Sequence, residues 1–437
     1  MKLINKLFFA YLLLMSVVSC EDFIEGDGIN RDPNSPTAVP IAAQMPAFQI
    51  ALADVTGGGF SRFNCMMMQQ VEGVARQWSS FNQYTGLVPN RFDADWTNIY
   101  ENILNEIQIA RKGAVENDYK HYQGILNIME AYTIMMATDV WDDMPYSDAF
   151  RGIDAINPTF DTQAEIYAAA YALLDEGQSL LAGGAGALTI GGDDVFYGGD
   201  VANWDRAASA IRARALLKDK NYTGAMSEAM ASFSEASQNL AFAYPDAGNA
   251  GPWYRFNDGR TGDIEFHPTM RGLMTDLNDL DRLNVMDGTF TTSHPYLKAD
   301  FLQEMITFRE MQFIIAEADV RAGVTQVGYD AYLAGIRASF DRLGAGGYDE
   351  YIAQESINPG VGNLTLEHVM TQKYIAMYLQ PEVYSDWRRT GIPALTPVSG
   401  TTIPVRWNYA LNEYLFNTNA PDETSIDIYT DKVGWNR

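Results

Sequence analysis

Apolar residues along much of this 437-residue chain recur every three or four positions, which is the spacing of a helix with one buried face. The clearest stripe lies between 93 and 117, where Asp93 is placed to cap the start of the helix. A second stripe lies between 122 and 140, after a break at Asn117. Because the turn between the stripes is short, we expect the two helices to be antiparallel neighbours.

The same arrangement of paired stripes recurs twice further along the chain. One pair covers 204–233, and the other covers 311–343, where Gly323 and Gly344 follow the two helices. Each pair occupies roughly 34–48 residues, the size of a tetratricopeptide-type repeat, although the consensus of that repeat is absent. Three more long helices are predicted, at about 60–78, 162–182 and 365–379. The pattern therefore predicts a mainly α-helical scaffold built from helix pairs.

Long segments rich in Gly, Asn, Asp, Pro and Thr separate these helices. They cover 183–203, 241–266, 281–300, 345–364 and 396–437. They carry many of the aromatic residues, and connections of this length within a compact domain are often functional. None of them has the composition of an interdomain linker. We therefore expect a single domain from residue 20 to 437, with little β structure and a binding face built from loops.

The first twenty residues have the features of an export signal. Two lysines precede an apolar stretch at 7–18, which is too short to span a bilayer. The sequence VVSC at 17–20 then places Cys20 where a bacterial lipobox has its lipidated cysteine. The alternative is an ordinary secretory signal in which this cysteine is incidental. We predict a signal peptide at 1–19 and a body tethered to the membrane by a lipid on Cys20.

The balance of charge restricts the partners of the chain. Asp and Glu number 56 against 30 Lys and Arg, which gives a formal net charge of −26. Nucleic acid is excluded because phosphates demand a basic surface, and anionic lipid headgroups are disfavoured for the same reason. Of the two cysteines, Cys65 lies in an apolar stretch with no histidine nearby in sequence, so we expect a buried, unreactive thiol.

Motifs for common catalytic chemistry are absent from the sequence. It contains no G-x-S-x-G, H-E-x-x-H, phosphate-binding loop or Rossmann glycine run, and its four histidines lack metal-ligand spacing. No cofactor or metal is therefore predicted, and we do not expect an enzyme. Two alternatives stay open: a lone calcium ion in a loop, and a carboxylate pair for glycoside hydrolysis, which an acidic chain brings together by chance.

Several stretches, in order along the chain, resemble the motifs of one family. Residues 29–37 (INRDPNSPT) resemble its N-x-D-P-N-x-P-T opening, and 138–149 (TDVWDDMPYSDA) resemble its D-x-x-G-D-x-P-Y-S-E-A motif, with Asp142 where Gly is usual. Residues 308–318 (FREMQFIIAEA) resemble its T-Y-x-E-x-x-F-I-x-A-E-A helix. The most specific match lies at 372–391, where QKYIA is followed by SDWRRTG. The chain thereby resembles the SusD/RagB nutrient-binding outer-membrane lipoproteins, in particular their second SusD-like subfamily.

This resemblance covers nearly the whole chain and carries several expectations. It implies a SusD-like fold of tetratricopeptide-like helix pairs whose long loops form a binding face. It implies a lipid-anchored, surface-exposed protein of the outer membrane, as in the Bacteroidetes, that acts with a SusC-like TonB-dependent transporter in uptake. The ligand that it implies is an oligosaccharide or, in the alternative, a peptide.

The matched motifs describe the scaffold rather than the binding site. Glu317 lies within an apolar helix, so we expect a structural carboxylate that is paired with a base. Arg388 and Arg389 follow Asp386 closely and are expected to tie the end of their helix to a neighbouring loop.

Two clusters that mix aromatic and polar residues are candidates for the ligand site. Sugars stack their C–H faces on aromatic rings and form hydrogen bonds with amide, carboxylate and guanidinium groups. The first cluster, where an early helix gives way to loop, consists of Arg76, Trp78, Phe81, Asn82 and Tyr84. The second lies in a predicted loop and consists of Trp253, Tyr254 and Arg255. We expect Trp78 and Trp253 to be stacking platforms; the alternative is that these rings fill the core or brace the loops.

Other classes of function remain to be separated from the glycan-binding lipoprotein. A surface glycan hydrolase on a helical scaffold would turn over its ligand, whereas a binding protein would not. A structural or adhesive lipoprotein would bind no nutrient. Assays of turnover and of binding with the purified protein distinguish these classes.

Overall fold

The computed structural model describes residues 39–288 and 294–437, so Cys20 and the motif at 29–37 lie outside the described residues. Helices dominate the described part, and none of its helices is long and apolar enough to cross a membrane. The longer helices are α3 (Ile41–Val55), α7 (Glu106–Glu116), α8 (Lys120–Trp141), α9 (Gln163–Ala182), α10 (Val201–Lys218), α11 (Tyr222–Ala231), α15 (Phe308–Ala322), α16 (Gln326–Leu343) and α18 (Leu366–Ala376).

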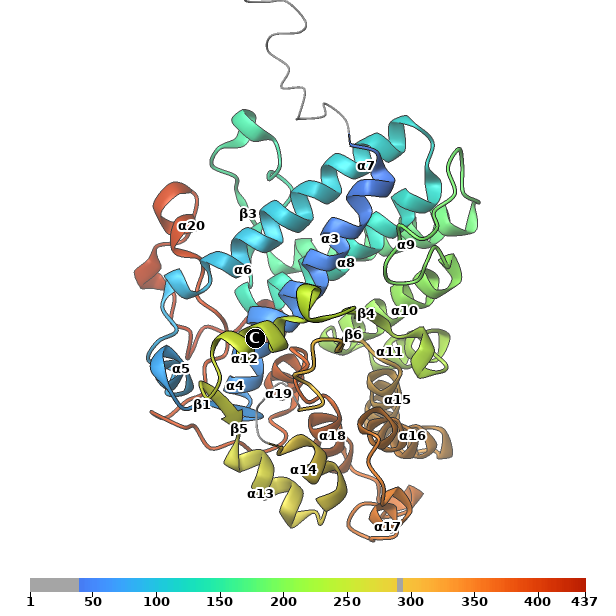
Figure 1. The fold of residues 1–437 in the computed structure, drawn as a ribbon, viewed down its shortest axis with the longest axis vertical. Helices are drawn as coiled ribbons and strands as arrows, with labels where there is room; N and C mark the ends of the chain where they lie inside the picture. Colours follow the sequence, from blue (N-terminus) through green and yellow to red (C-terminus); the bar gives the residue numbers. More distant parts are fainter. Residues whose placement is uncertain (1–38, 289–293) are drawn as a thin grey trace, which may run out of the picture.

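These helices pack in pairs, as the apolar stripes predict. Helix α8 packs against α7 and α9, α10 packs against α11, and α15 packs against α16. The pairs follow one another down one side of the molecule, from α8 and α9 through α10 and α11 to α15 and α16 (Figure 1). The mainly α-helical fold class is therefore confirmed.

The ends of several helices use the residues that their sequences favour. The side chain of Thr162 accepts a hydrogen bond from the backbone N–H of Glu165, whose carboxylate accepts in return from the Thr162 backbone, a capping box that begins α9. Gly323 follows α15, and Gly344 follows α16 with a left-handed backbone (φ 61°), as predicted. The predicted helices at 162–182 and 365–379 correspond to α9 and α18.

Asp93 does not cap its helix as predicted. It is itself the first residue of α6 (Asp93–Thr97), and its carboxylate instead accepts hydrogen bonds from the backbone amides of Leu411 (2.6 Å) and Asn412 (3.4 Å). Those amides belong to the first turn of α20 (Leu411–Phe416), so Asp93 joins the C-terminal segment to α6. The sequence separation of more than 300 residues hides this partner from a local pattern.

The predicted helix at 60–78 is wrong in its extent. Helix α4 (Ser61–Met67) ends before Gln69, whose positive φ of 55° breaks the helix. The chain then forms strand β1 (Val71–Gly73) and starts a new short helix, α5 (Arg76–Asn82). Strand β1 pairs in antiparallel register with β5 (Ile264–Phe266), which supplies the backbone partners that a continued helix would have provided.

Several predicted loops contain short helices. The segment 241–266 contains α12 (Pro252–Gly259), which starts with a proline at its first position. The remaining short helices are α13 (Pro268–Asp276), α14 (Leu280–Met286), α17 (Tyr348–Ile352) and α19 (Val383–Thr390). Two further short sheets pair β2 (Met144–Pro145) with β3 (Phe160–Asp161), and β4 (Leu240–Ala243) with β6 (Leu302–Ile306).

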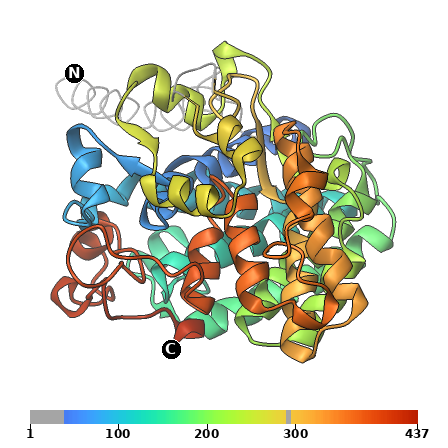
Figure 2. The ribbon, with the colours of Figure 1, turned by 90° about the horizontal axis from the view of Figure 1, so that it is seen from below.

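The C-terminal segment closes onto the N-terminal helices. Figure 2 shows it, in red, beside the blue segment that contains α5. The ring of Trp407 stacks on Phe92, with ring centroids 4.8 Å apart, and its indole N–H donates to the side-chain oxygen of Asn64 (3.0 Å). The hydroxyl of Tyr84 accepts from the backbone amide of Val398 (3.2 Å). These contacts join the two ends of the described chain into one body.

Buried charges in the core are paired with one another. Glu317 accepts two hydrogen bonds from Arg389, at 2.6 and 2.8 Å, which confirms its expected pairing with a base. Arg389 therefore joins α19 to helix α15 rather than to a loop, whereas Arg388 donates to the carbonyl of Val405 in the loop that follows, at 3.1 Å. Cys65 is a buried free thiol, and burial raises its pKa, as expected for an unreactive cysteine.

Candidate functional site

A cavity of about 930 Å³ opens between the N-terminal helices and α12. Its walls come from α3, α4, α5, α6, α12 and two π-helical segments, η1 (Thr56–Phe60) and η3 (Asn98–Asn105). The aromatic residues of the lining are Phe48, Phe63, Trp78, Phe81 and Phe256. The polar residues of the lining are Asp54, Arg62, Gln77, Arg91, Asp95, Asn98, Asn102, Glu106 and Arg255. The pairing of β1 with β5 brings α5 and α12 together, and both helices contribute residues to the lining.

Three consecutive glycines shape the wall where α3 passes into α4. The segment η1 contains Gly57, Gly58 and Gly59. Gly58 has non-helical angles (φ −88°, ψ −117°), which produce a kink between α3 and α4. A Cβ added to Gly59 would lie 2.1 Å from Oδ1 of Asp95, a distance that no side chain tolerates. The missing side chains therefore bring the Asp95 carboxyl group against the backbone and leave the cavity open at Gly58 and Gly59.

One end of the cavity is built from aromatic rings around Trp78. The Trp78 ring is 6% exposed, meets Phe256 edge to face with centroids 4.9 Å apart, and stacks on Phe63 at 5.7 Å. Its indole N–H has no acceptor within the protein. The guanidinium of Arg62 lies over the rings of Phe256 (5.0 Å) and Trp78 (5.9 Å). This end therefore offers apolar faces together with unused hydrogen-bond donors.

Arg62 and Asp95 carry opposite charges into the same cavity without forming an ion pair. Burial lowers the pKa of Arg62 to about 10, although Asp95 acts in the opposite direction. Burial also raises the pKa of Asp95 to about 7, although the positive charge of Arg62 opposes the rise. The Asp95 carboxyl group therefore changes charge close to neutral pH.

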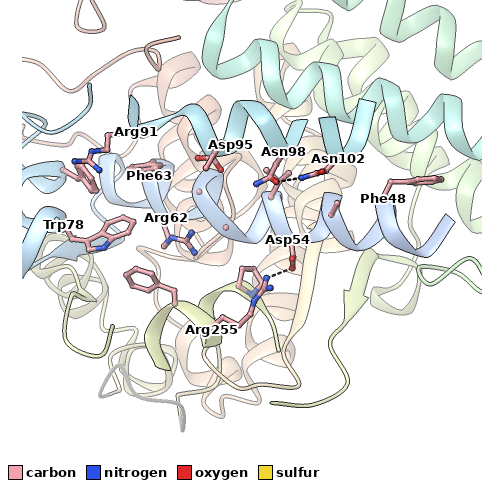
Figure 3. A pocket seen from close by; sticks show the side chains of 18 of the residues that line it. Phe48, Asp54, Arg62, Phe63, Trp78, Arg91, Asp95, Asn98, Asn102 and Arg255 are labelled. Atoms are coloured by element: carbon pink, nitrogen blue, oxygen red, sulfur yellow. Dashed lines mark hydrogen bonds and ion pairs between the residues drawn. The ribbon is translucent and has the colours of Figure 1, made fainter. Parts of the chain in front are cut away.

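Four of the other polar groups are tied to the walls in pairs. Arg255 forms an ion pair with Asp54 (2.8 Å), whose carboxylate also accepts from the hydroxyl of Tyr244 (2.5 Å). The side-chain amide of Asn102 donates to the amide oxygen of Asn98 (2.8 Å). Figure 3 shows Asp95, Asn98 and Asn102 along one wall, with Arg62, Trp78 and Arg255 across from them. Amides and charged groups thus line the cavity beyond its aromatic end.

The structure brings part of the two predicted clusters together. Trp78 and Phe81 from the first cluster and Arg255 from the second line the cavity. Arg76, Asn82, Tyr84 and Tyr254 do not line it. Arg76 is exposed and forms an ion pair with Asp263 at 2.5 Å, and Tyr84 is buried against the C-terminal segment.

Trp253 is part of the core, which contradicts its expected position on a ligand-facing surface. Its ring is 2% exposed, and its indole N–H donates to the hydroxyl of Ser61 (2.9 Å). Because α12 is a helix rather than a loop, Trp253 faces inward while Arg255 and Phe256 reach the cavity. The alternative of a core-filling ring is therefore correct for Trp253.

Several cavity residues are not identified from the sequence as candidates for the site, among them Arg62, Asp95 and Asn98. Arg62 and Asp95 lie in stretches whose periodicity predicts ordinary helices, and nothing local marks them as part of a site. The run Thr56-Gly57-Gly58-Gly59 was the available signal, because three glycines inside an apolar helix indicate a kink or a close approach.

A second hollow, of about 550 Å³, lies between 142–160 and the C-terminal segment. Several of its charged groups already have partners: Arg437 forms an ion pair with Asp142, and Arg406 donates to the carbonyls of Trp141 and Trp407. Within the described residues, no group of three or more His, Cys, Asp or Glu side chains is arranged to hold a metal ion. The aromatic cavity is thus the better candidate for a ligand site.

Helix pairs and an aromatic, polar cavity define a mainly helical protein with a candidate ligand site. A family model, the second SusD-like family, described as starch-binding and associating with the outer membrane, matches residues 33–294 and 280–410. The chain belongs to this family. No curated protein matches the sequence significantly.

Solved structures share the fold over most of the chain. A SusD/RagB family protein from Bacteroides thetaiotaomicron has a TM-score of 0.75 at 18% identity, over 91% of this chain and 99% of that one. A protein described as chitin-binding has a TM-score of 0.75 at 21% identity, over 91% and 100%. A chitin-binding SusD homologue from Flavobacterium johnsoniae has a TM-score of 0.68 at 18% identity, over 90% and 99%. The SusD-like fold of the chain is thereby established.

Proposed function

We propose that this protein captures an oligosaccharide at the cell surface and delivers it to a SusC-like TonB-dependent transporter. The observation that carries the proposal is the cavity beside Trp78, where aromatic rings and unused polar groups face one space. Its volume of about 930 Å³ lies at the upper end of the range for small-molecule sites, and it accommodates several sugar units.

The chemistry of the cavity suits a sugar chain. Sugar rings present C–H faces to aromatic rings, and Phe256, which is partly exposed, lines the cavity beside the largely buried rings of Trp78 and Phe81. The indole N–H of Trp78 lacks an acceptor, and a buried donor of this kind gains free energy when a ligand hydroxyl accepts its hydrogen bond. Asn98 and Asn102 supply further donors and acceptors on the opposite wall.

Relatives add support for a glycan rather than a peptide. Two of the similar structures are described as chitin-binding, and the family model is described as starch-binding. The peptide alternative draws on the charged groups of the same cavity. It is weaker because none of these three descriptions names a peptide.

A second candidate function has one observation in its favour. Asp95 has a pKa raised to about 7, and a carboxyl group of this kind in a cavity is what a glycosidase uses as a general acid. Of the two other carboxylates in the lining, Asp54 and Glu106, Asp54 is engaged by Arg255 and Tyr244. We therefore favour binding, and incubation of the purified protein with candidate glycans followed by product analysis tests for turnover.

Attachment to the outer membrane is part of the proposal. A lipid on Cys20 would tether the body through residues 21–38, ahead of the first described helix. A single acyl chain anchors weakly, so contact with a transporter would help to hold the protein in place. Purification of the native protein in mild detergent should therefore recover a large TonB-dependent barrel with it.

The experiment that tests ligand capture is calorimetric titration of the soluble body with chitin-derived, starch-derived and acidic oligosaccharides. Trp78→Ala should weaken binding by about 1–3 kcal/mol. Trp387→Ala is the matched control, because this tryptophan also has an indole N–H without an acceptor but does not line the cavity. Equal binding by wild-type protein and Trp78→Ala would contradict the proposed site.

A further inference from the structure

Two arginines stand apart from all the others in the described part of the chain. The described residues contain 20 of the 21 arginines in the sequence, since Arg31 lies outside them, and 18 of these 20 bind the protein itself. Most of these arginines form ion pairs with carboxylates. Arg206 and Arg388 instead donate hydrogen bonds to uncharged groups. Arg62 and Arg91 have neither kind of partner, and both line the aromatic cavity.

The unpartnered state of these two side chains is unexpected from composition. The chain has 56 acidic residues against 30 basic ones, so a carboxylate is readily available to almost any arginine. Arg62 is partly buried, and its Nε–H is buried without an acceptor in the protein. A buried N–H without a hydrogen bond is costly, and a ligand oxygen would supply the missing acceptor.

Aromatic rings hold both guanidinium groups in place at the same end of the cavity. Arg62 lies over Phe256 (5.0 Å) and Trp78 (5.9 Å), and Arg91 lies over Phe81 (5.3 Å). Figure 3 shows Arg62 and Arg91 on either side of the space beside Trp78. A planar guanidinium that is already oriented in this way matches the two oxygens of a carboxylate.

The carboxylates that line the cavity do not neutralise these arginines. Asp54 is engaged by Arg255 at 2.8 Å, and Glu106 follows Asn102 by four residues, about one helical turn further along the chain. Asp95 forms no ion pair with Arg62, and burial raises its pKa to about 7, so part of its population is uncharged at neutral pH. The aromatic end thus retains positive charge inside a strongly acidic protein.

From this arrangement we infer that the ligand is an acidic oligosaccharide, whose sugar carboxylate binds Arg62 and Arg91 while its ring lies against Trp78 and Phe256. The inference rests on the proposed function, because it specifies the ligand class of that same cavity. A uronic or sialic acid fits this chemistry, since its carboxylate is attached directly to the sugar ring and reaches a guanidinium beside the stacking face.

Calorimetry with matched pairs of glycans tests the inference. The probes are oligogalacturonates and their methyl esters, hyaluronan fragments and their carboxyl-reduced forms, and sialyllactose and lactose. An acidic member should bind about ten- to a hundredfold more tightly than its neutral counterpart, as expected for charge-assisted hydrogen bonds. Arg62→Gln should abolish this preference, and Arg91→Gln should reduce it. Arg337→Gln, an exposed arginine outside the cavity, is the matched control and should leave the preference unchanged.

The outcomes separate this inference from the proposed function. Neutral chitin or starch oligosaccharides that bind through Trp78, with no advantage for any acidic probe, would overturn the inference and leave the function intact. An acidic preference that survives in both arginine variants, or tighter binding of acidic peptides than of acidic glycans, would also overturn it. Failure of Trp78→Ala to affect any binding would contradict the function itself. Melting curves for Arg62→Gln and Arg91→Gln show that each variant is folded before it is compared.

Discussion

The carboxyl group of Asp95 lies directly against the backbone of Gly59. A Cβ at Gly59 would be 2.1 Å from Oδ1 and 2.2 Å from Oδ2 of Asp95. The glycine run in η1 therefore has a defined role: it allows a carboxyl group from α6 to enter the wall of the cavity, in the turn that joins α3 to α4. The position of Asp95 depends on a residue that has no side chain.

Substitution of Gly59 tests this relationship. Gly59→Ala should displace Asp95 and destabilise the protein by about 1–3 kcal/mol, the usual cost of overpacking. Gly113→Ala is the matched control, because a Cβ at this position in α7 meets nothing within 4 Å. That control should be neutral or stabilising by about 0.5–1 kcal/mol, since alanine favours helix more than glycine does. Chemical denaturation of both variants checks the prediction, and equal stability of the two would contradict it.

Asp95 should make the stability of the protein depend on pH. Its pKa is raised from an ordinary value of 3.8 to about 7 in the folded state, so the folded protein holds this proton more tightly than the unfolded chain. Its contribution to stability is therefore fully present below about pH 4 and is lost as the pH rises through 7. Asp95→Asn should remove this loss, so the variant should gain melting temperature relative to wild type between about pH 4 and pH 8. A difference that does not change with pH would refute the assignment.

The same carboxyl group should affect the binding of an acidic glycan. Ionised Asp95 repels a ligand carboxylate, so the affinity for an acidic glycan should be higher at about pH 6 than at about pH 8. The ligand carboxylate is ionised at both pH values, so it does not cause the difference. The other charged groups that line the cavity are Arg62, Arg91, Arg255, Asp54 and Glu106, and none is a histidine. Titrations of wild-type protein and Asp95→Asn at both pH values test this, and the variant should show little pH dependence. An unchanged dependence in the variant would place the titrating group elsewhere.

Trp78 and Trp253 should respond differently to truncation. Trp253 is a core ring with a hydrogen bond to Ser61, so Trp253→Ala should cost about 3–5 kcal/mol of stability, and it has no direct contact with the cavity. Trp78→Ala should be the less destabilising change and should weaken glycan binding. Melting temperature and affinity measured on both variants separate the two roles. A loss of affinity for Trp253→Ala alone would reverse the assignment.

The lipid anchor is tested by Cys20→Ala. Without the acylated cysteine the protein should leave the membrane fraction, because the described helices include none that could cross a bilayer. Fractionation of cells that express each form measures the distribution. A variant that stays with the membrane, without accumulation of unprocessed chain, would contradict lipidation at this position.

The helix pairs could be predicted because each has a long apolar stripe on one face. The stripe at 122–140 lies within α8, whose 22 residues make about six turns, and periodicity of this length is a reliable signal. Helices α5 and α12 could not be predicted in this way, because helices of seven or eight residues give barely two turns of pattern. Asp93 shows the limit of local cap rules, since its partners lie on α20.

The candidate site could be predicted only in part from composition. Trp78, Phe81 and Arg255 belong to clusters that mix rings with polar groups, and they meet in one cavity. Trp253 belongs to the same kind of cluster but faces inward, because the direction of a side chain depends on the helix that carries it. Arg62 could not be found, since its lack of a partner is a property of the whole fold.

A crystal structure of the protein with the oligosaccharide that binds most tightly tests the central claim most directly. We predict sugar density in the cavity between α5 and α12, with a ring against Trp78 and Phe256 and a sugar oxygen bonded to the guanidinium of Arg62. Sugar bound instead in the hollow beside Asp142 and the C-terminal segment, with the aromatic cavity empty, would contradict it.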